Sequence, residues 1–223
     1  LNGLLARGNR GFAFIDEGLK RNLTILNTLL GASASKQFQS GTGRLNDLDC
    51  VLVMATNEPE YDAIIGDTKA EALVNRIHDV PFPYNERIQD EREIYLEYKT
   101  TAEKLGRTWV PHTEDVLAFL AVVSRLVDPP GKLSVIDKAK LYNGEQVGDV
   151  TEEMLMDIRK HADGEKADDG RRELMTGLGP RTIQEAFALA LNDEDVIRKG
   201  GTAQIDPLLV LRYLDGMLNS KTS

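Results

Sequence analysis

The chain has 223 residues, of which 41% are hydrophobic, so it can bury the core of one large domain or two small ones. Its formal net charge of -9 argues against a protein whose main task is to hold nucleic acid, because phosphate binding needs clustered lysine and arginine. A single cysteine, Cys50, excludes an internal disulfide framework and fits a reducing compartment. No apolar run is long enough to span a membrane, so we expect a cytoplasmic protein that binds neither nucleic acid nor membrane.

Residues 12–20, FAFIDEGLK, begin with four apolar residues and continue directly into Asp16 and Glu17. A short apolar run is typical of a strand buried in a parallel sheet, and functional residues of open α/β sheets gather at the carboxyl ends of strands. Two adjacent carboxylates at such a point require a cation nearby. The alternative is an acidic, solvated loop, and this stretch alone does not separate the two interpretations.

The next segments predict a helix and then a hairpin. Leucines recur at three- and four-residue spacing in residues 19–30, which predicts an amphipathic helix that ends at Gly31. Polar and apolar residues are interleaved around SGTG in residues 36–50, which favours a hairpin or an extended loop.

A second strand, a helix and a third strand are predicted next. Residues 50–55 form another apolar run, which leads into Asn57 at its carboxyl end. A short helix over residues 69–77 carries Arg76 near its end, and residues 78–84 indicate a third strand at a sheet edge, because two prolines interrupt it.

Beyond Asn85 helical periodicity replaces strand patterns, so we expect a domain boundary there and an α/β part followed by an α part. In this fold class the first part is the C-terminal portion of a parallel-sheet core. The expected helices of the second part are residues 88–105, 114–127, 133–141, 151–161, 180–191 and 207–218.

Three further polar residues have both a functional and a structural interpretation. Asn57 can hydrogen-bond a water or phosphate, or it can cap the helix that follows. Arg76 can reach the phosphate site of a neighbouring subunit, or it can stabilise a helix C-terminus. Arg181 follows Gly179 and Pro180 at a helix start, where the helix dipole disfavours a cation unless an anion is bound nearby.

The order of these features, DE, then a strand-end Asn, then a helix-end Arg, then GPR, resembles the AAA+ ATPases. The resemblance implies that Asp16 orients Mg²⁺ in Walker B, that Glu17 polarises the attacking water, and that Asn57 is sensor 1. It further implies that Arg76 is the arginine finger and that Arg181 is sensor 2, which contacts ATP.

The resemblance narrows to the PrkA-type serine protein kinases in LLARGNRGFAFIDEGLK, ATNEPEYDAIIGDTKAEALVNRIHDVPFPY, DEREIYLEY and GLGPR. It covers residues 4–98 and implies an AAA+ core over residues 1–86 and a helical lid over residues 87–223. It also implies ATP and Mg²⁺ as cofactors, a homo-oligomer, and protein substrates phosphorylated on serine. Magnesium-chelatase subunits and MCM helicases share ARGNRG and DE, but not NEPEYDAIIGDTKAEALVNRI.

The sequence departs from the family in lacking G-x-x-x-x-G-K-[ST], the loop that cradles phosphates. The nearest glycine-lysine pair, Gly131-Lys132, has no upstream glycine at the required spacing. We therefore expect part of a longer enzyme that is inactive alone. Two alternatives remain: a non-catalytic interaction module, and another AAA+ motor such as a chelatase or helicase.

Overall fold

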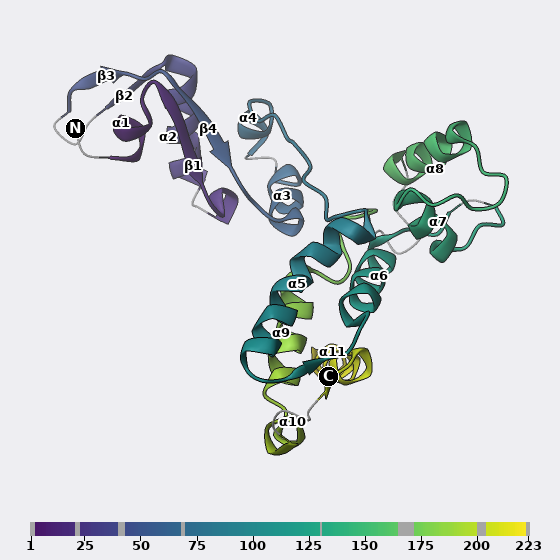
Figure 1. Ribbon diagram of the computed structural model, residues 1–223. Coiled ribbons are helices and arrows are strands. Elements are labelled where there is room, and N and C mark those ends of the chain that lie inside the picture. Colours follow the sequence, from purple (N-terminus) through teal and green to yellow (C-terminus); the bar gives the residue numbers. More distant parts are fainter. Residues whose placement is uncertain are drawn as a thin grey trace. The chain divides into compact units, whose positions relative to one another are not determined.

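A computed structural model describes residues 3–20, 23–39, 43–67, 70–129, 131–164, 172–199 and 204–221. The chain divides into two compact units, Leu1–Pro81 and Phe82–Ser223, and each is described by itself. The first unit combines strands and helices, and the second is mainly helical (Figure 1). This agrees with the predicted order of an α/β part followed by helices. No described helix is both long enough and apolar enough to cross a membrane.

The first unit is built around two parallel strands, β1 and β4, with helix α2 and a short antiparallel hairpin between them in the chain. The predicted hairpin is therefore present, although its tip at residues 40–42 lies outside the described residues. The elements in chain order are α1 (Leu4–Gly8), β1 (Gly11–Ile15), the 3₁₀ helix η1 (Gly18–Lys20), α2 (Leu23–Ser35), β2 (Gln37–Gln39), β3 (Leu45–Asp47), β4 (Cys50–Met54), α3 (Glu58–Ile65) and α4 (Glu71–Val74).

The two faces of the β1–β4 pair differ in burial. On one face, side chains of β4 pack against buried residues of α2, among them Leu26 and Ala32. The sequence predicts strands buried on both faces, and this is wrong for the described residues. Four apolar side chains that the register places opposite one another are exposed on the other face, namely Phe12, Phe14, Val51 and Val53.

Three local predictions in this unit need correction. Helix α2 does not end at Gly31 but continues to Ser35, and Lys36 then adopts a left-handed conformation with φ 56°. Residues 78–84 form no strand, because the two prolines cannot donate hydrogen bonds to a neighbouring strand. The predicted helix over residues 69–77 is only the short α4, and residue 69 lies outside the described residues.

The second unit is a set of helices around an aromatic cluster. Phe187 is fully buried and stacks on Tyr98 and Trp109, with ring centroids 5.0 and 5.3 Å away. Helices α5, α6, α9 and α11 contribute to this core. The elements are α5 (Ile88–Lys104), β5 (Thr108–Trp109), α6 (Thr113–Arg125), α7 (Val135–Tyr142), α8 (Glu152–Gly164), α9 (Pro180–Leu191), α10 (Glu194–Lys199), β6 (Gln204–Ile205) and α11 (Pro207–Lys221).

Six helices of this unit were predicted within a few residues of their observed ends. Helix α10 was missed, and so was the parallel pairing of β5 with β6, which joins Trp109 to Ile205. Each of these strands has two residues, too few for an alternating pattern to be recognised.

Candidate active site

The ends of β1 and β4 lie at the same edge of the sheet. The register pairs Ile15 with Met54, and the amide of Ala55 donates to the carbonyl of Ile15 at 3.0 Å. Asp16 is the residue after Ile15, and Asn57 lies three residues after Met54. The prediction that both strands carry polar residues to one carboxyl edge is therefore confirmed.

Asp16 and Glu17 form a sharp, exposed turn at this edge. The amide of Glu17 donates to Oδ1 of Asp16 at 3.0 Å, and Glu17 has a left-handed backbone with φ 50°. Such a conformation is unfavourable for a residue with a side chain, and it recurs at functional sites. Gly18 follows because a Cβ there would lie 3.0 Å from the side chain of Met54. The turn thus passes directly against β4.

Lys20 is the cation that the acidic pair requires. Its Nζ lies 2.8 Å from Oε1 of Glu17 and 3.2 Å from Oε1 of Glu60, so it bridges two carboxylates from different elements. Glu17 and then Glu60 raise the pKa of Lys20 above its ordinary value. Lys20 was not predicted as a site residue, although it lies three residues after Glu17. Its contact with Glu60 could not have been inferred from sequence spacing.

Glu60 on α3 gathers the polar groups that follow β4. The hydroxyl of Thr56 donates to its Oε2 at 3.1 Å. The amide of Asn57 is assigned with its nitrogen toward Glu60, because this orientation gives donor–acceptor distances of 2.7 and 3.1 Å. Asn57 is the N-cap of α3 by position, yet its side chain makes no capping hydrogen bond. Capping alone therefore does not explain this asparagine.

Arg76 lies in the turn after α4, and its side chain is exposed. No hydrogen bond or ion pair joins it to another residue in the part of the chain that the structure describes. The sequence predicts Arg76 inside a helix near its end, whereas α4 stops at Val74 and Arg76 lies in the turn that follows. Its role between subunits stays a prediction.

Arg181 is the second residue of α9, after Gly179 as N-cap and Pro180 at the first position. The predicted helix start at Pro180 is therefore correct, and the arginine is exposed. It belongs to the second unit, so the structure describes it separately from the residues at the strand edge.

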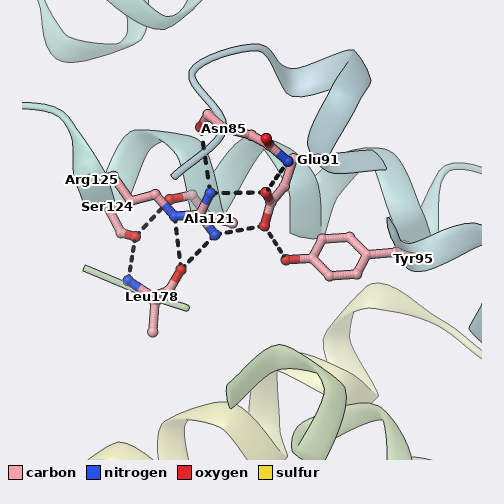
Figure 2. A network of polar contacts seen from close by, with 7 residues as sticks. All are labelled: Asn85, Glu91, Tyr95, Ala121, Ser124, Arg125 and Leu178. Atoms are coloured by element: carbon pink, nitrogen blue, oxygen red, sulfur yellow. Dashed lines mark hydrogen bonds and ion pairs between the residues drawn. The ribbon is translucent and has the colours of Figure 1, made fainter. Parts of the chain in front are cut away.

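A buried polar network holds the segment before Arg181 (Figure 2). Arg125 at the end of α6 and Glu91 on α5 form a bidentate ion pair with distances of 2.9 and 2.6 Å, and both side chains are fully buried. The same guanidinium donates twice to the carbonyl of Leu178, at 2.9 and 2.7 Å. Sequence analysis missed this network. The available signal was a charged residue on the apolar face of each of two helices.

The described side chains at the strand edge offer too few ligands to hold a metal ion by themselves. Among the described residues no three His, Cys, Asp or Glu side chains come together as a metal site. Mg²⁺ is commonly held by only one or two carboxylates together with substrate phosphates. Asp16 therefore fits a metal shared with a nucleotide, and the edge does not fit a metal held by protein alone.

Two protein-family models together match nearly the whole chain. Residues 1–132 match the PrkA AAA domain, and residues 136–223 match the PrkA serine protein kinase C-terminal domain. The chain belongs to the PrkA family. The boundary between the two matches falls inside the second unit, so Arg181 lies in the C-terminal match rather than in the AAA match.

Curated relatives of the PrkA family carry two different names. The ATP-dependent protease PrkA of Bacillus subtilis (strain 168) is 31% identical over 100% of this chain and 33% of its own length. The serine/threonine kinase YeaG of Escherichia coli (strain K12) is 26% identical over 83% of this chain and 29% of its own length. The chain thus spans about a third of the length of the curated relatives it matches.

Solved structures show a weaker likeness. NtrX from Brucella abortus matches with a TM-score of 0.43 and 19% identity, over 89% of this chain and 45% of NtrX. NtrX in complex with ATP matches with a TM-score of 0.42 and 18% identity, over 96% of this chain and 50% of NtrX. At such low scores this likeness adds nothing to the family assignment.

Proposed function

We propose that this chain supplies the metal-binding and water-activating groups of an ATP hydrolysis site in an AAA+ ATPase module. One observation carries the proposal: Asp16, Glu17 and Asn57 follow two parallel strands at one carboxyl edge, inside the part that matches the PrkA AAA domain. Open α/β sheets bind their ligands at this edge. Phosphoryl transfer itself depends mainly on positioning and charge neutralisation, which these side chains can provide.

Each residue at the edge has a distinct proposed task. Asp16 would hold Mg²⁺, which would neutralise charge on the phosphates of ATP. Glu17 orients the attacking water and accepts its proton, and Asn57 hydrogen-bonds that water or the γ-phosphate. Lys20 holds the Glu17 carboxylate in place by an ion pair, while Glu60 anchors both Lys20 and Asn57.

Two arginines have proposed roles in contacting ATP. Arg76 acts as an arginine finger on the ATP of a neighbouring subunit in a homo-oligomer, and its exposure after α4 is consistent with this. Arg181 acts as sensor 2 on the phosphates, and its position in the first turn of α9 suits an anion.

The phosphate loop is proposed to come from outside these 223 residues, since the sequence contains no G-x-x-x-x-G-K-[ST]. Backbone amides of that loop and its lysine hold the β- and γ-phosphates in P-loop enzymes. We therefore expect the chain alone to bind Mg-ATP weakly and to be inactive. The term "intact protein" denotes the longer protein that joins this chain to a phosphate loop.

Phosphorylation of protein serines is the proposed output of the intact protein, which we expect to be cytoplasmic. The name of the Escherichia coli relative and the name of the C-terminal family model support it. A second candidate, ATP-dependent proteolysis, is supported by the name of the Bacillus subtilis relative. Incubating the intact protein with ATP and casein separates the two outputs. A kinase transfers the γ-phosphate to casein, whereas a protease cleaves it.

The ATPase proposal is tested by steady-state phosphate release from the intact protein. Glu17→Gln should lower kcat by roughly 10²- to 10⁴-fold with little change in KM, because it removes the general base and leaves Asp16. Asp16→Asn should weaken Mg-ATP binding as well. Asp62→Asn is the matched control, since Asp62 is an exposed carboxylate on α3 of the same unit, and it should change neither parameter. Unchanged turnover in Glu17→Gln would assign the acidic pair to structure.

A further inference from the structure

The segment Gly177 to Gly179, which leads into α9, lies directly against the end of α6. Gly177 has φ 108°, and a Cβ there would lie 2.6 Å from the carbonyl oxygen of Ser124. The amide of Leu178 donates to the hydroxyl of Ser124 at 3.0 Å, while its carbonyl accepts both bonds from Arg125. Two consecutive residues of α6 therefore bind both backbone polar groups of Leu178.

The guanidinium that holds Leu178 is itself fixed in orientation. Glu91 binds it through two parallel hydrogen bonds, and the hydroxyl of Tyr95 and the amide of Asn85 donate to the Glu91 oxygens at 2.6 and 3.1 Å (Figure 2). A planar, bidentate pair of this kind restricts both partners to one geometry. Arg125 therefore presents its remaining donors to the Leu178 carbonyl in one direction only.

Tyr84 covers the same segment from another side. Its ring lies under the guanidinium of Arg125, 4.6 Å from ring centroid to Cζ. Its amide donates to the carbonyl of Leu174 at 2.9 Å, and a Cβ at Gly179 would meet its hydroxyl at 3.1 Å. The segment is thus held by side chains on one side and by an aromatic ring on another.

The anchoring stops just before Arg181. Pro180 fixes its own φ at the first position of α9, so the orientation of Leu178 determines where the next helical turn begins. The side chain of Arg181 is exposed and makes no hydrogen bond or ion pair within the part of the chain that the structure describes. Its backbone is held while its guanidinium is available to a ligand.

We propose that Arg125, held by Glu91 and assisted by Ser124, is the positioning residue that aims Arg181 at its phosphate ligand. The proposal rests on the proposed ATPase function and goes beyond it by assigning a task to a buried ion pair. Replacing a buried ion pair by apolar residues is often neutral or stabilising, so such a pair is weak evidence for a stabilising role. Here its specific effect is geometric, because it fixes one carbonyl three residues before a ligand-binding arginine.

The test is the Arg125→Lys variant of the intact protein, with kcat/KM for ATP as the readout. Lysine keeps the charge but loses the bidentate fork, so Leu178 should shift and Arg181 should contact phosphate poorly. We expect kcat/KM to fall on the order of tenfold to a hundredfold, as for other small misplacements of a positioning group. Ser124→Ala is a milder change that removes the acceptor for the Leu178 amide, so it should lower kcat/KM by a smaller factor.

Arg159→Lys is the matched control. Arg159 forms a bidentate pair with Glu86 at 2.7 and 3.0 Å and stacks over Tyr142 at 4.5 Å, so it repeats the chemistry of Arg125 elsewhere in the same unit. It is more exposed than Arg125 and does not contact Leu178. This variant should leave kcat/KM unchanged, which separates loss of positioning from loss of an arginine ion pair in general.

A double-mutant cycle decides between positioning and mere structural support. If Arg125 acts through Arg181, then Arg125→Lys should cost nothing further in an Arg181→Ala background. The same loss in both backgrounds, or no loss at all in Arg125→Lys, would overturn the inference. If Arg181→Ala alone leaves kcat/KM unchanged, the proposed role of Arg181 fails too, whereas the test of Glu17 stands independently.

Discussion

Removing one member of the Glu91–Arg125 pair should strongly destabilise the second unit, because the other member is left as a buried charge without its partner. Both side chains have no exposed surface, so Glu91→Leu leaves an uncompensated guanidinium in the core, and Arg125→Met leaves an uncompensated carboxylate. Breaking a buried pair in this way costs about 3–5 kcal/mol. We expect each single variant to lose this much free energy of unfolding.

The double variant Glu91→Leu/Arg125→Met should lose much less free energy of unfolding than the sum of the losses in the two single variants, because neither charge is left without its partner. What remains is the carbonyl of Leu178, the hydroxyl of Tyr95 and the part-buried side-chain amide of Asn85, which each lose a partner at a cost of about 1–3 kcal/mol, so the double variant should lose about 5 kcal/mol. With about 4 kcal/mol lost by each single variant and about 5 kcal/mol by the double variant, the coupling energy between Glu91 and Arg125 should be about 3 kcal/mol.

Urea unfolding followed by tryptophan fluorescence measures this coupling. Trp109 is the single tryptophan of the sequence, it is buried, and its indole donates to Glu114 at 2.6 Å, so its signal reports on the second unit alone. Leu189→Ala, an exposed position on α9, serves as a control that should change the free energy little. Strictly additive costs for the two single variants would refute the reasoning, because they would show that the two charges do not interact.

Gly177, Tyr95 and Arg76 each allow a further test. Gly177→Ala should destabilise the second unit, because the added Cβ would meet the carbonyl of Ser124, and a urea midpoint equal to that of the unsubstituted chain would contradict this packing. Burial and the Glu91 carboxylate hold the pKa of Tyr95 well above its ordinary value, so its contribution to stability is complete below pH ~10 and is lost as the pH rises further. The phenolate absorbance of Tyr95, identified by comparison with the Tyr95→Phe variant, should appear only as the chain unfolds. Ionisation of Tyr95 in the folded chain at its ordinary pKa would contradict its burial. Arg76→Ala should abolish ATP hydrolysis in a homo-oligomer, and mixing with a Glu17→Gln partner should restore part of it, since both defects then fall in one site and leave another site with Glu17 and Arg76 intact; failure of any mixture to recover activity would place Arg76 in its own subunit's site.

The sequence predicts the strand edge well because periodicity and position suffice there. Two apolar runs, each ending in polar residues and separated by a helical pattern, are enough to place Asp16 and Asn57 at one edge of a parallel pair. The long helices of the second unit follow from their apolar spacing in the same way, and α9 begins at the predicted Pro180.

The contacts that organise the site could not be predicted, because they join residues with no fixed spacing. Lys20 meets Glu60 across 40 residues, and Arg125 meets Leu178 across 53. Both pairings depend on how helices pack, which a single sequence does not determine. The bare face of the β1–β4 pair was also missed, because a continuous apolar run does not reveal whether one face or both are covered.

Activation of water by Glu17 can be tested by identifying the nucleotide that the intact protein retains. The Glu17→Gln variant is incubated with Mg-ATP, freed of unbound nucleotide, and its bound nucleotide is released and identified over time. The account predicts that ATP remains bound and uncleaved long after the unsubstituted protein holds only ADP, because Asp16 still holds the metal while the base is gone. Conversion to ADP in the variant at the rate of the unsubstituted protein would contradict the account.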